Sequence, residues 1–85
     1  MLTIKVLGPG CDNCKKLAYL AERAKIHLGI EAEIIKVTNY AEIMKYPILS
    51  TPGLVINEKL VASGRIPSEA EITTFLTDAL ETAWR

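Results

Sequence analysis

The sequence predicts an α/β protein whose strands and helices follow the order β-α-β-α-β-β-α. Three observations indicate this order. The chain opens with an alternating apolar pattern typical of a strand, a long stretch with helical periodicity follows directly, and two short apolar runs precede a second amphipathic stretch. A βαβ unit followed by a hairpin and a final helix forms a four-stranded mixed sheet flanked by helices.

The first strand is predicted over residues 2–7, where Leu2, Ile4 and Val6 share one face, and it ends at the Gly-Pro-Gly run at 8–10. A helix follows from Cys14, because apolar residues then recur every three or four positions and a glycine stands where a C-terminal cap belongs. The positions that carry this pattern are Leu17, Ala18, Ala21, Ala24, Leu28 and Gly29.

A second strand is predicted over residues 30–37. Asn39, with Glu42 three positions later, fits a capping box, which opens a short helix that ends before Pro47. Four large side chains in or next to these two predicted helices are interpreted as packing residues: Tyr19, Tyr40, Met44 and Tyr46.

Residues 54–56 and 60–62 are predicted to be the two strands of a hairpin, because Asn57-Glu58 between them suits a turn. Ser68 with Glu71 is a second capping box, and it opens the last helix. The apolar face of that helix consists of Ile72, Phe75, Leu76, Ala79, Leu80 and Ala83.

Length and composition indicate a single domain over residues 1–85. The 85 residues suffice for one core and are too few for two. The ten acidic and ten basic side chains balance, so no nucleic-acid surface is predicted. The N-terminus does not resemble a signal peptide, and no apolar run approaches the roughly 20 residues that span a bilayer. We therefore expect a cytoplasmic monomer that binds neither membrane nor nucleic acid.

The chemistry is predicted at the two cysteines, Cys11 and Cys14. Structural disulfides are rare in the cytoplasm, and a disulfide that closes a loop of about four residues stabilises a fold by only roughly 2 kcal/mol. A Cys-x-x-Cys pair between a strand and a helix is instead typical of redox chemistry. The unpaired N–H groups at the helix N-terminus favour the thiolate of Cys11, and the charge of Asp12 opposes it.

We therefore expect Cys11 to be a moderately activated nucleophile and the couple to be reducing rather than strongly oxidising. Cys14 begins the apolar face of the helix, so it is expected to be buried and to resolve the mixed disulfide that Cys11 forms with a partner.

A metal site is the alternative interpretation of the two cysteines. Structural zinc takes four ligands, and the other soft ligand nearby, His27, lies thirteen residues beyond Cys14. In a helix this separation is about 20 Å, too far for a shared site. Two thiolates alone suit a soft ion such as Cu(I), so a metal carrier stays open as a second function.

Two motifs resemble those of the small thioredoxin-like redox-active disulfide proteins of archaea and bacteria, which are close in size to glutaredoxins. The resemblance covers essentially the whole chain and implies a thioredoxin-like fold. It also implies that Cys11 attacks, that Cys14 resolves, and that Pro52 is a cis-proline facing them. The motifs are Gly8-Pro9-Gly10-Cys11-Asp12-Asn13-Cys14 and Thr51-Pro52-Gly53.

The resemblance implies a thiol-disulfide oxidoreductase, a dithiol electron carrier that reduces protein disulfides and is itself reduced by a separate reductase of flavin or ferredoxin type. It implies no cofactor and no metal. Thioredoxins carry a buried acid on the strand before the motif, where this strand offers only Lys5, so the proton acceptor for Cys14 is left unassigned. The residues expected to contact substrate are Gly10, Asp12, Asn13, Thr51 and Pro52.

Overall fold

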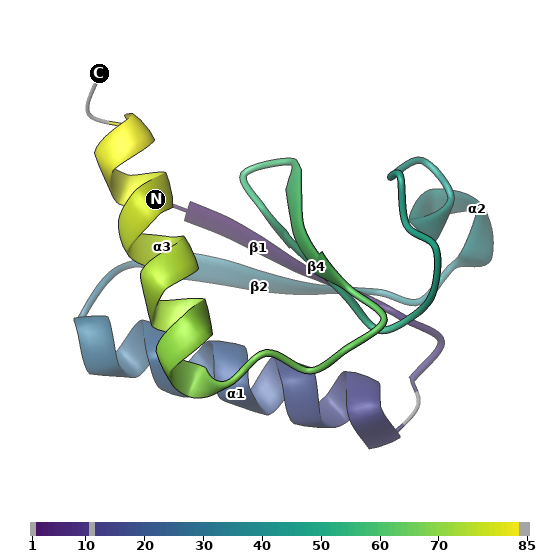
Figure 1. Ribbon diagram of the computed structural model, residues 1–85, viewed down its shortest axis with the longest axis horizontal. Helices are drawn as coiled ribbons and strands as arrows, with labels where there is room; N and C mark the ends of the chain where they lie inside the picture. The colour runs from purple at the N-terminus through teal and green to yellow at the C-terminus, as the bar shows by residue number, and fades with distance from the viewer. Residues whose placement is uncertain (1, 11, 84–85) are drawn as a thin grey trace.

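The computed structural model of the chain describes residues 2–10 and 12–83, with the backbone alone described for residues 82 and 83. No helix within these ranges is long and apolar enough to cross a membrane. The elements follow the predicted order (Figure 1): β1 (Leu2–Leu7), α1 (Asp12–Leu28), β2 (Ala32–Val37), α2 (Tyr40–Ile43), β3 (Gly53–Ile56), β4 (Lys59–Ser63) and α3 (Glu69–Ala83).

The four strands form one mixed sheet in the order β2-β1-β3-β4. β1 pairs with β2 in parallel, whereas the β1–β3 and β3–β4 pairs are antiparallel. A parallel pair needs a crossover connection, which α1 supplies between β1 and β2. This topology confirms the predicted mixed sheet flanked by helices.

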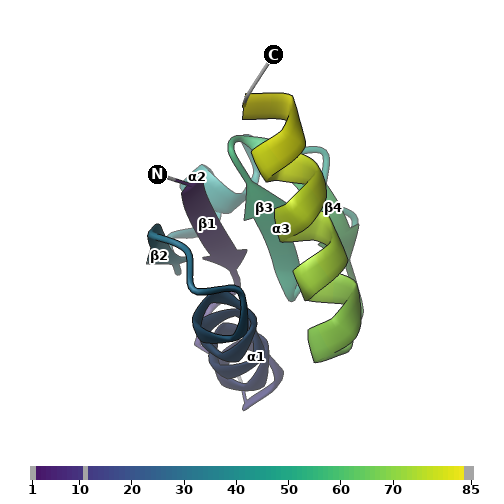
Figure 2. The same cartoon turned by 90° about the vertical axis from the view of Figure 1, so that its left-hand side faces the viewer.

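Two apolar clusters cover the two faces of the sheet. The larger lies between the sheet and the long helices α1 and α3, which contact one another and point in different directions (Figure 2). The smaller consists of Leu7, Val55 and Ile43, the last from α2. β1 contributes to both clusters because successive side chains of a strand point to opposite faces. The larger cluster includes Leu2, Ile4, Val6, Leu17, Ala21, Leu54, Ile72 and Leu76.

The β3–β4 hairpin turns through Asn57 (φ 50°) and Glu58 (φ 67°), both with left-handed backbone. A two-residue hairpin turn needs positive φ at both central positions, and asparagine tolerates it well. Asn57 also ties the turn to β1. The N–H of Thr3 donates to Asn57 Oδ1 (3.0 Å), and the N–H of Asn57 donates to the carbonyl oxygen of Thr3 (2.8 Å). The predicted hairpin is confirmed.

The second strand begins later than predicted, at Ala32 rather than at residue 30. The reason lies in the end of α1. Gly29 has φ 65°, and its N–H donates to the carbonyl oxygen of Ile26 (3.1 Å). The N–H of Ile30 donates to the carbonyl oxygen of Lys25 (3.4 Å). Residue 30 therefore closes the helix and does not enter the sheet.

Among the described residues, only one of the two hydrogen-bonding halves of the capping box predicted for α2 is formed. Asn39 Oδ1 accepts the N–H groups of Ala41 (2.8 Å) and Glu42 (3.3 Å), as an N-cap does. The Glu42 carboxylate instead binds the ammonium of Lys45, at 3.1 Å. This ion pair uses the group that would have completed the box.

Three of the residues interpreted as packing residues are exposed, and for these the prediction is wrong. Tyr19, Tyr40 and Met44 are 62%, 72% and 54% exposed. On α1 the buried face is set by Leu17, Ala18 and Ala21, which leaves Tyr19 on the outer side. Only Tyr46 of the four is partly buried, against the smaller cluster.

The capping box of α3 is complete. The N–H of Glu71 donates to Ser68 Oγ (3.1 Å), and the N–H of Ser68 donates to Glu71 Oε1 (3.4 Å). Glu71 Oε2 also pairs with Arg65 Nη1 at 3.0 Å. The hydrogen bond from Ser68 and then the Arg65 guanidinium lower the pKa of Glu71 below its ordinary value of 4.5.

We expect this cap to weaken in acid. Because the pKa of Glu71 is lower in the folded than in the unfolded chain, its carboxylate stabilises the fold above about pH 4.5, and this contribution is lost as pH falls through the lowered pKa. Glu71→Gln keeps the shape and loses the charge. The Tm of wild type should exceed that of Glu71→Gln at pH 7, and the difference should shrink at pH 3. A constant difference across this range would contradict the assignment.

Candidate active site

Cys14 occupies the first turn of α1, which follows β1 after the turn at residues 8–10. Its side chain is buried, with 5% exposed, and its sulfur takes part in a disulfide bond. Helix N-termini present unpaired N–H groups that stabilise a thiolate when such a bond is reduced. The predicted nucleophile, Cys11, lies outside the described residues.

Gly8 allows the strand, the helix and the loop before β3 to meet. A Cβ atom on Gly8 would overlap Cys14 Sγ, and it would lie 3.3 Å from Cys14 Cβ and 3.9 Å from Thr51 Cβ. The N–H of Gly8 donates to the carbonyl oxygen of Val37 (3.0 Å), which fixes the glycine beside the end of β2. A residue without a side chain at this position thus brings Cys14 and Thr51 to the same end of the sheet.

The Thr51–Pro52 peptide bond is cis, the isomer that the resemblance implies. Thr51 is exposed and Pro52 is buried directly before β3. The loop after β4 supports this turn, because the N–H of Gly64 donates to the carbonyl oxygen of Pro52 (2.9 Å). Gly64 has φ 72°, and a Cβ on it would overlap Ser50 Oγ, so a larger residue would press on this support.

A small cleft of about 80 Å³ opens beside Cys14. Lysines from two elements contribute to its walls, Lys15 from α1 and Lys36 from β2. Lys36 reaches the cleft because β2 pairs it with Val6 of β1, on the face that α1 covers. Neither lysine forms an ion pair with another residue that the structure describes. The full lining is Val6, Gly8, Gly10, Cys14, Lys15, Lys36 and Thr38.

Lys5, which stands on the strand that carries an acid in thioredoxins, lies on the sheet face opposite Cys14. Its ammonium pairs with Glu58 (2.5 Å) and donates to Tyr46 Oη (2.9 Å), and Tyr46 Oη donates to Glu58 (3.0 Å). The contacts with Glu58 and Tyr46 raise the pKa of Lys5. This cluster holds the hairpin turn against the sheet and does not serve the cysteine.

The predicted site residues divide into two groups. Gly10 lines the cleft together with Cys14, and its φ of 92° explains the glycine. Asp12 and Asn13 are exposed on the first turn of α1 and do not line the cleft.

Five residues that line the cleft were not predicted as site residues: Val6, Gly8, Lys15, Lys36 and Thr38. For Lys36 the signal was available. Residues 32, 34 and 36 alternate along β2, so a lysine at 36 must share a face with Ala32 and Ile34, which pack on the larger cluster.

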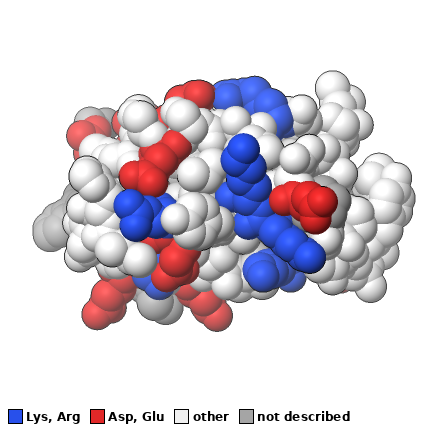
Figure 3. Space-filling view, turned by 90° about the horizontal axis from the view of Figure 1, so that it is seen from below, with Lys and Arg blue, Asp and Glu red and all other residues white. Residues whose placement is uncertain are grey.

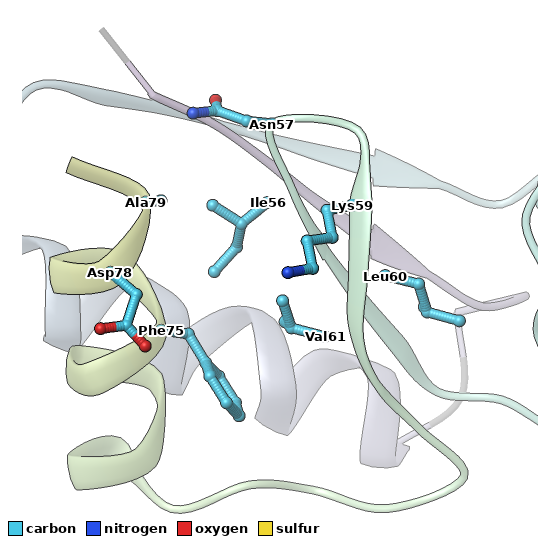
Figure 4. Close-up of a pocket in the computed structure, with 8 residues that line it drawn as sticks. All are labelled: Ile56, Asn57, Lys59, Leu60, Val61, Phe75, Asp78 and Ala79. Atoms are coloured by element: carbon cyan, nitrogen blue, oxygen red, sulfur yellow. The ribbon is translucent and has the colours of Figure 1, made fainter. Parts of the chain in front are cut away.

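A larger cavity lies at the other end of the sheet (Figure 4). It measures about 520 Å³ and opens between the hairpin and α3, with apolar walls from Ile56, Val61 and Phe75. Ile56 pairs with Ile4 near the start of β1, whereas Gly8 and Cys14 lie past its end. This cavity is therefore separate from the cysteine site.

Strand order and crossover are those of the thioredoxin fold, and a solved structure shows this independently. The structure of thioredoxin-2, described as a component of the malaria parasite protein secretion machinery, superposes with a TM-score of 0.69 over 92% of this chain and 82% of that chain, at 14% sequence identity. The class of protein that the fold defines is thus a thioredoxin-fold protein.

Sequence comparison is more specific. A family model described as thioredoxin domain matches residues 2–77. The thioredoxin of Methanocaldococcus jannaschii is 38% identical over 95% of this chain and 93% of its own length, and that of Methanothermobacter thermautotrophicus is 35% identical over 91% and 100%. The chain belongs to the thioredoxin domain family and is a thioredoxin-like redox protein.

Proposed function

We propose that the protein is a thiol-disulfide oxidoreductase that reduces disulfides in other proteins through Cys11 and Cys14. The observation that carries the proposal is the buried, disulfide-bonded sulfur of Cys14 on the first turn of α1, at the end of the sheet where Thr51 and Pro52 precede β3. Its bonding partner in the proposal is Cys11, because the sequence holds two cysteines.

The reaction is two successive thiol-disulfide exchanges. The Cys11 thiolate attacks one sulfur of the partner's disulfide, a Cys11–partner disulfide forms, and the other partner sulfur leaves as a thiolate. The Cys14 thiolate then attacks Cys11 Sγ, the internal disulfide forms, and the second partner sulfur leaves. Two electrons pass to the partner. A separate reductase, of flavin or ferredoxin type, returns two electrons to the internal disulfide.

The loop before β3 is assigned to substrate binding. Thr51 is exposed while Pro52 is buried, so the Thr51 backbone is accessible to an extended segment of the partner. Gly10, Asp12 and Asn13 border the cysteines in sequence, and all three residues are exposed, so a partner can contact them.

The relatives support the same function. The two archaeal proteins carry the name thioredoxin and align along nearly their whole lengths. We further propose that residues 1–85 work as one domain, as a monomer, in the cytoplasm, where thiols are kept reduced.

Insulin reduction tests the proposal. With dithiothreitol as the electron source, the wild type is expected to accelerate precipitation of the insulin B chain well beyond dithiothreitol alone. The double variant Cys11→Ser, Cys14→Ser is the matched control and should give the background rate. Wild type at the background rate would refute the function. Copper bound in stoichiometric amount to the purified, reduced protein would favour the metal carrier instead.

A further inference from the structure

The cleft beside Cys14 carries positive charge that the described residues do not neutralise. Lys15 and Lys36 line it from two different elements, and no acidic side chain is among its lining residues. Five other basic side chains of the described residues do pair with carboxylates, for example Lys5 with Glu58 and Arg65 with Glu71. Figure 3 views the molecule from the side on which α1 lies, and there several blue side chains gather near the middle, with a red side chain beside them.

We propose that this cleft selects partner disulfides that have an acidic side chain beside the cysteine, and that Lys36 and Lys15 bind its carboxylate. The proposal rests on the function proposed above, and it adds the chemical class of the preferred partner. Lys36 and Lys15 are positioning residues here. They attract the partner by charge, while the bonds that form and break are those of the two exchanges.

The size and walls of the cleft suit a carboxylate. A volume of about 80 Å³ has room for two or three waters, or for one small anionic group, when a water takes roughly 30 Å³. The other walls are the two glycines, Val6, Thr38 and Cys14. Both lysines are exposed, so water and salt screen their attraction to a carboxylate, and the selection should depend on ionic strength.

The preference must be local rather than a property of the whole protein. The formal net charge is zero at pH 7, so long-range attraction gives no general preference for acidic partners. Asp12 supplies a negative charge on the first turn of α1, but it is exposed and does not line the cleft. An acidic group in the cleft would therefore face the two lysines.

Matched disulfide peptides provide the test. Two disulfide-linked peptides are compared that differ only in having Glu or Gln on both sides of the attacked cysteine. The rate of their reduction by the reduced protein is measured at low and at high ionic strength. Wild type is expected to reduce the Glu peptide about fivefold faster at low salt, and salt should diminish the ratio. In Lys36→Gln the ratio should approach one, and in Lys36→Glu it should invert.

Lys59→Glu is the control variant. Lys59 is exposed and forms no ion pair with the described residues, but it lies on the hairpin by the separate large cavity (Figure 4). It should keep the wild-type ratio. An unchanged ratio in Lys36→Glu, or an equal loss in Lys59→Glu, would overturn the charge selection alone. Failure of the wild type to reduce either peptide would overturn the redox function and this proposal with it.

Discussion

Cys14→Ser is expected to accumulate as a stable mixed disulfide with its partners, whereas Cys11→Ser is expected to form no adduct. The asymmetry follows from position. Cys14 is 5% exposed beneath the start of α1, so a partner disulfide reaches it poorly. In the sequence Cys11 directly precedes Asp12, the first residue of α1, so we expect the helix N-terminus to favour the Cys11 thiolate. Without the Cys14 thiolate the second exchange cannot release the partner.

Non-reducing gels measure this difference. Each variant is incubated with cell extract, quenched with acid and alkylating agent, and compared with and without reductant. Serine replaces only sulfur by oxygen, so the fold should persist in both variants, which thermal unfolding checks. The double variant Cys11→Ser, Cys14→Ser serves as the blank. Equal trapping by the two single variants, or trapping by Cys11→Ser alone, would show that the roles of the two cysteines are assigned wrongly.

The fold could be predicted from the sequence because each element carries a local signal. The box at Ser68 and Glu71 marks the start of α3, and Asn57 marks a turn that needs positive φ. Errors arose where a residue serves two elements. Ile30 has an apolar side chain typical of a strand, but its N–H closes α1, and spacing alone does not reveal that bond.

The site was predicted less fully, because it is assembled from residues far apart in sequence. The motif pointed to Cys14 and Gly10, which do line the cleft, and to Thr51, which lies at the same end of the sheet. Lys36 comes from a strand more than twenty residues after Cys14 and reaches the cleft only through the parallel register of β1 and β2. The alternation of side chains along β1 also excludes Lys5 from the site. Lys5 lies between Ile4 and Val6, so its side chain points to the opposite face of the sheet.

Gly8 is the clearest case of a residue whose role only three-dimensional contact reveals. In the sequence it belongs to a Gly-Pro-Gly turn, and turn chemistry explains it adequately. In the structure its missing side chain leaves the space that Cys14 Sγ occupies. No positive φ is required at this glycine, so a substitution by alanine tests the contact rather than the backbone conformation.

We expect Gly8→Ala to destabilise the protein by about 1–3 kcal/mol, the usual cost of forcing an extra group into a packed site. The change of glycine to alanine also restricts the unfolded chain, which by itself would stabilise by about 0.4–1 kcal/mol. Overpacking should win, because the new Cβ would overlap a buried sulfur and meet Cys14 Cβ at 3.3 Å. Urea unfolding of the reduced protein measures the free energy.

A double-mutant cycle with Cys14→Ala isolates the contact. Alanine at position 14 removes Sγ, the atom that the Gly8 substituent would overlap, and keeps Cβ. Gly8→Ala should therefore cost less in the Cys14→Ala background than in wild type, by more than about 0.5 kcal/mol, which exceeds the usual error of additivity for independent sites. Equal costs in the two backgrounds would mean that the new methyl group disturbs the Thr51 loop instead, since Thr51 Cβ lies 3.9 Å from the same position. In that case Gly8→Ala should slow insulin reduction because the partner binds less well. The double variant Gly8→Ala, Cys14→Ser should still trap adducts.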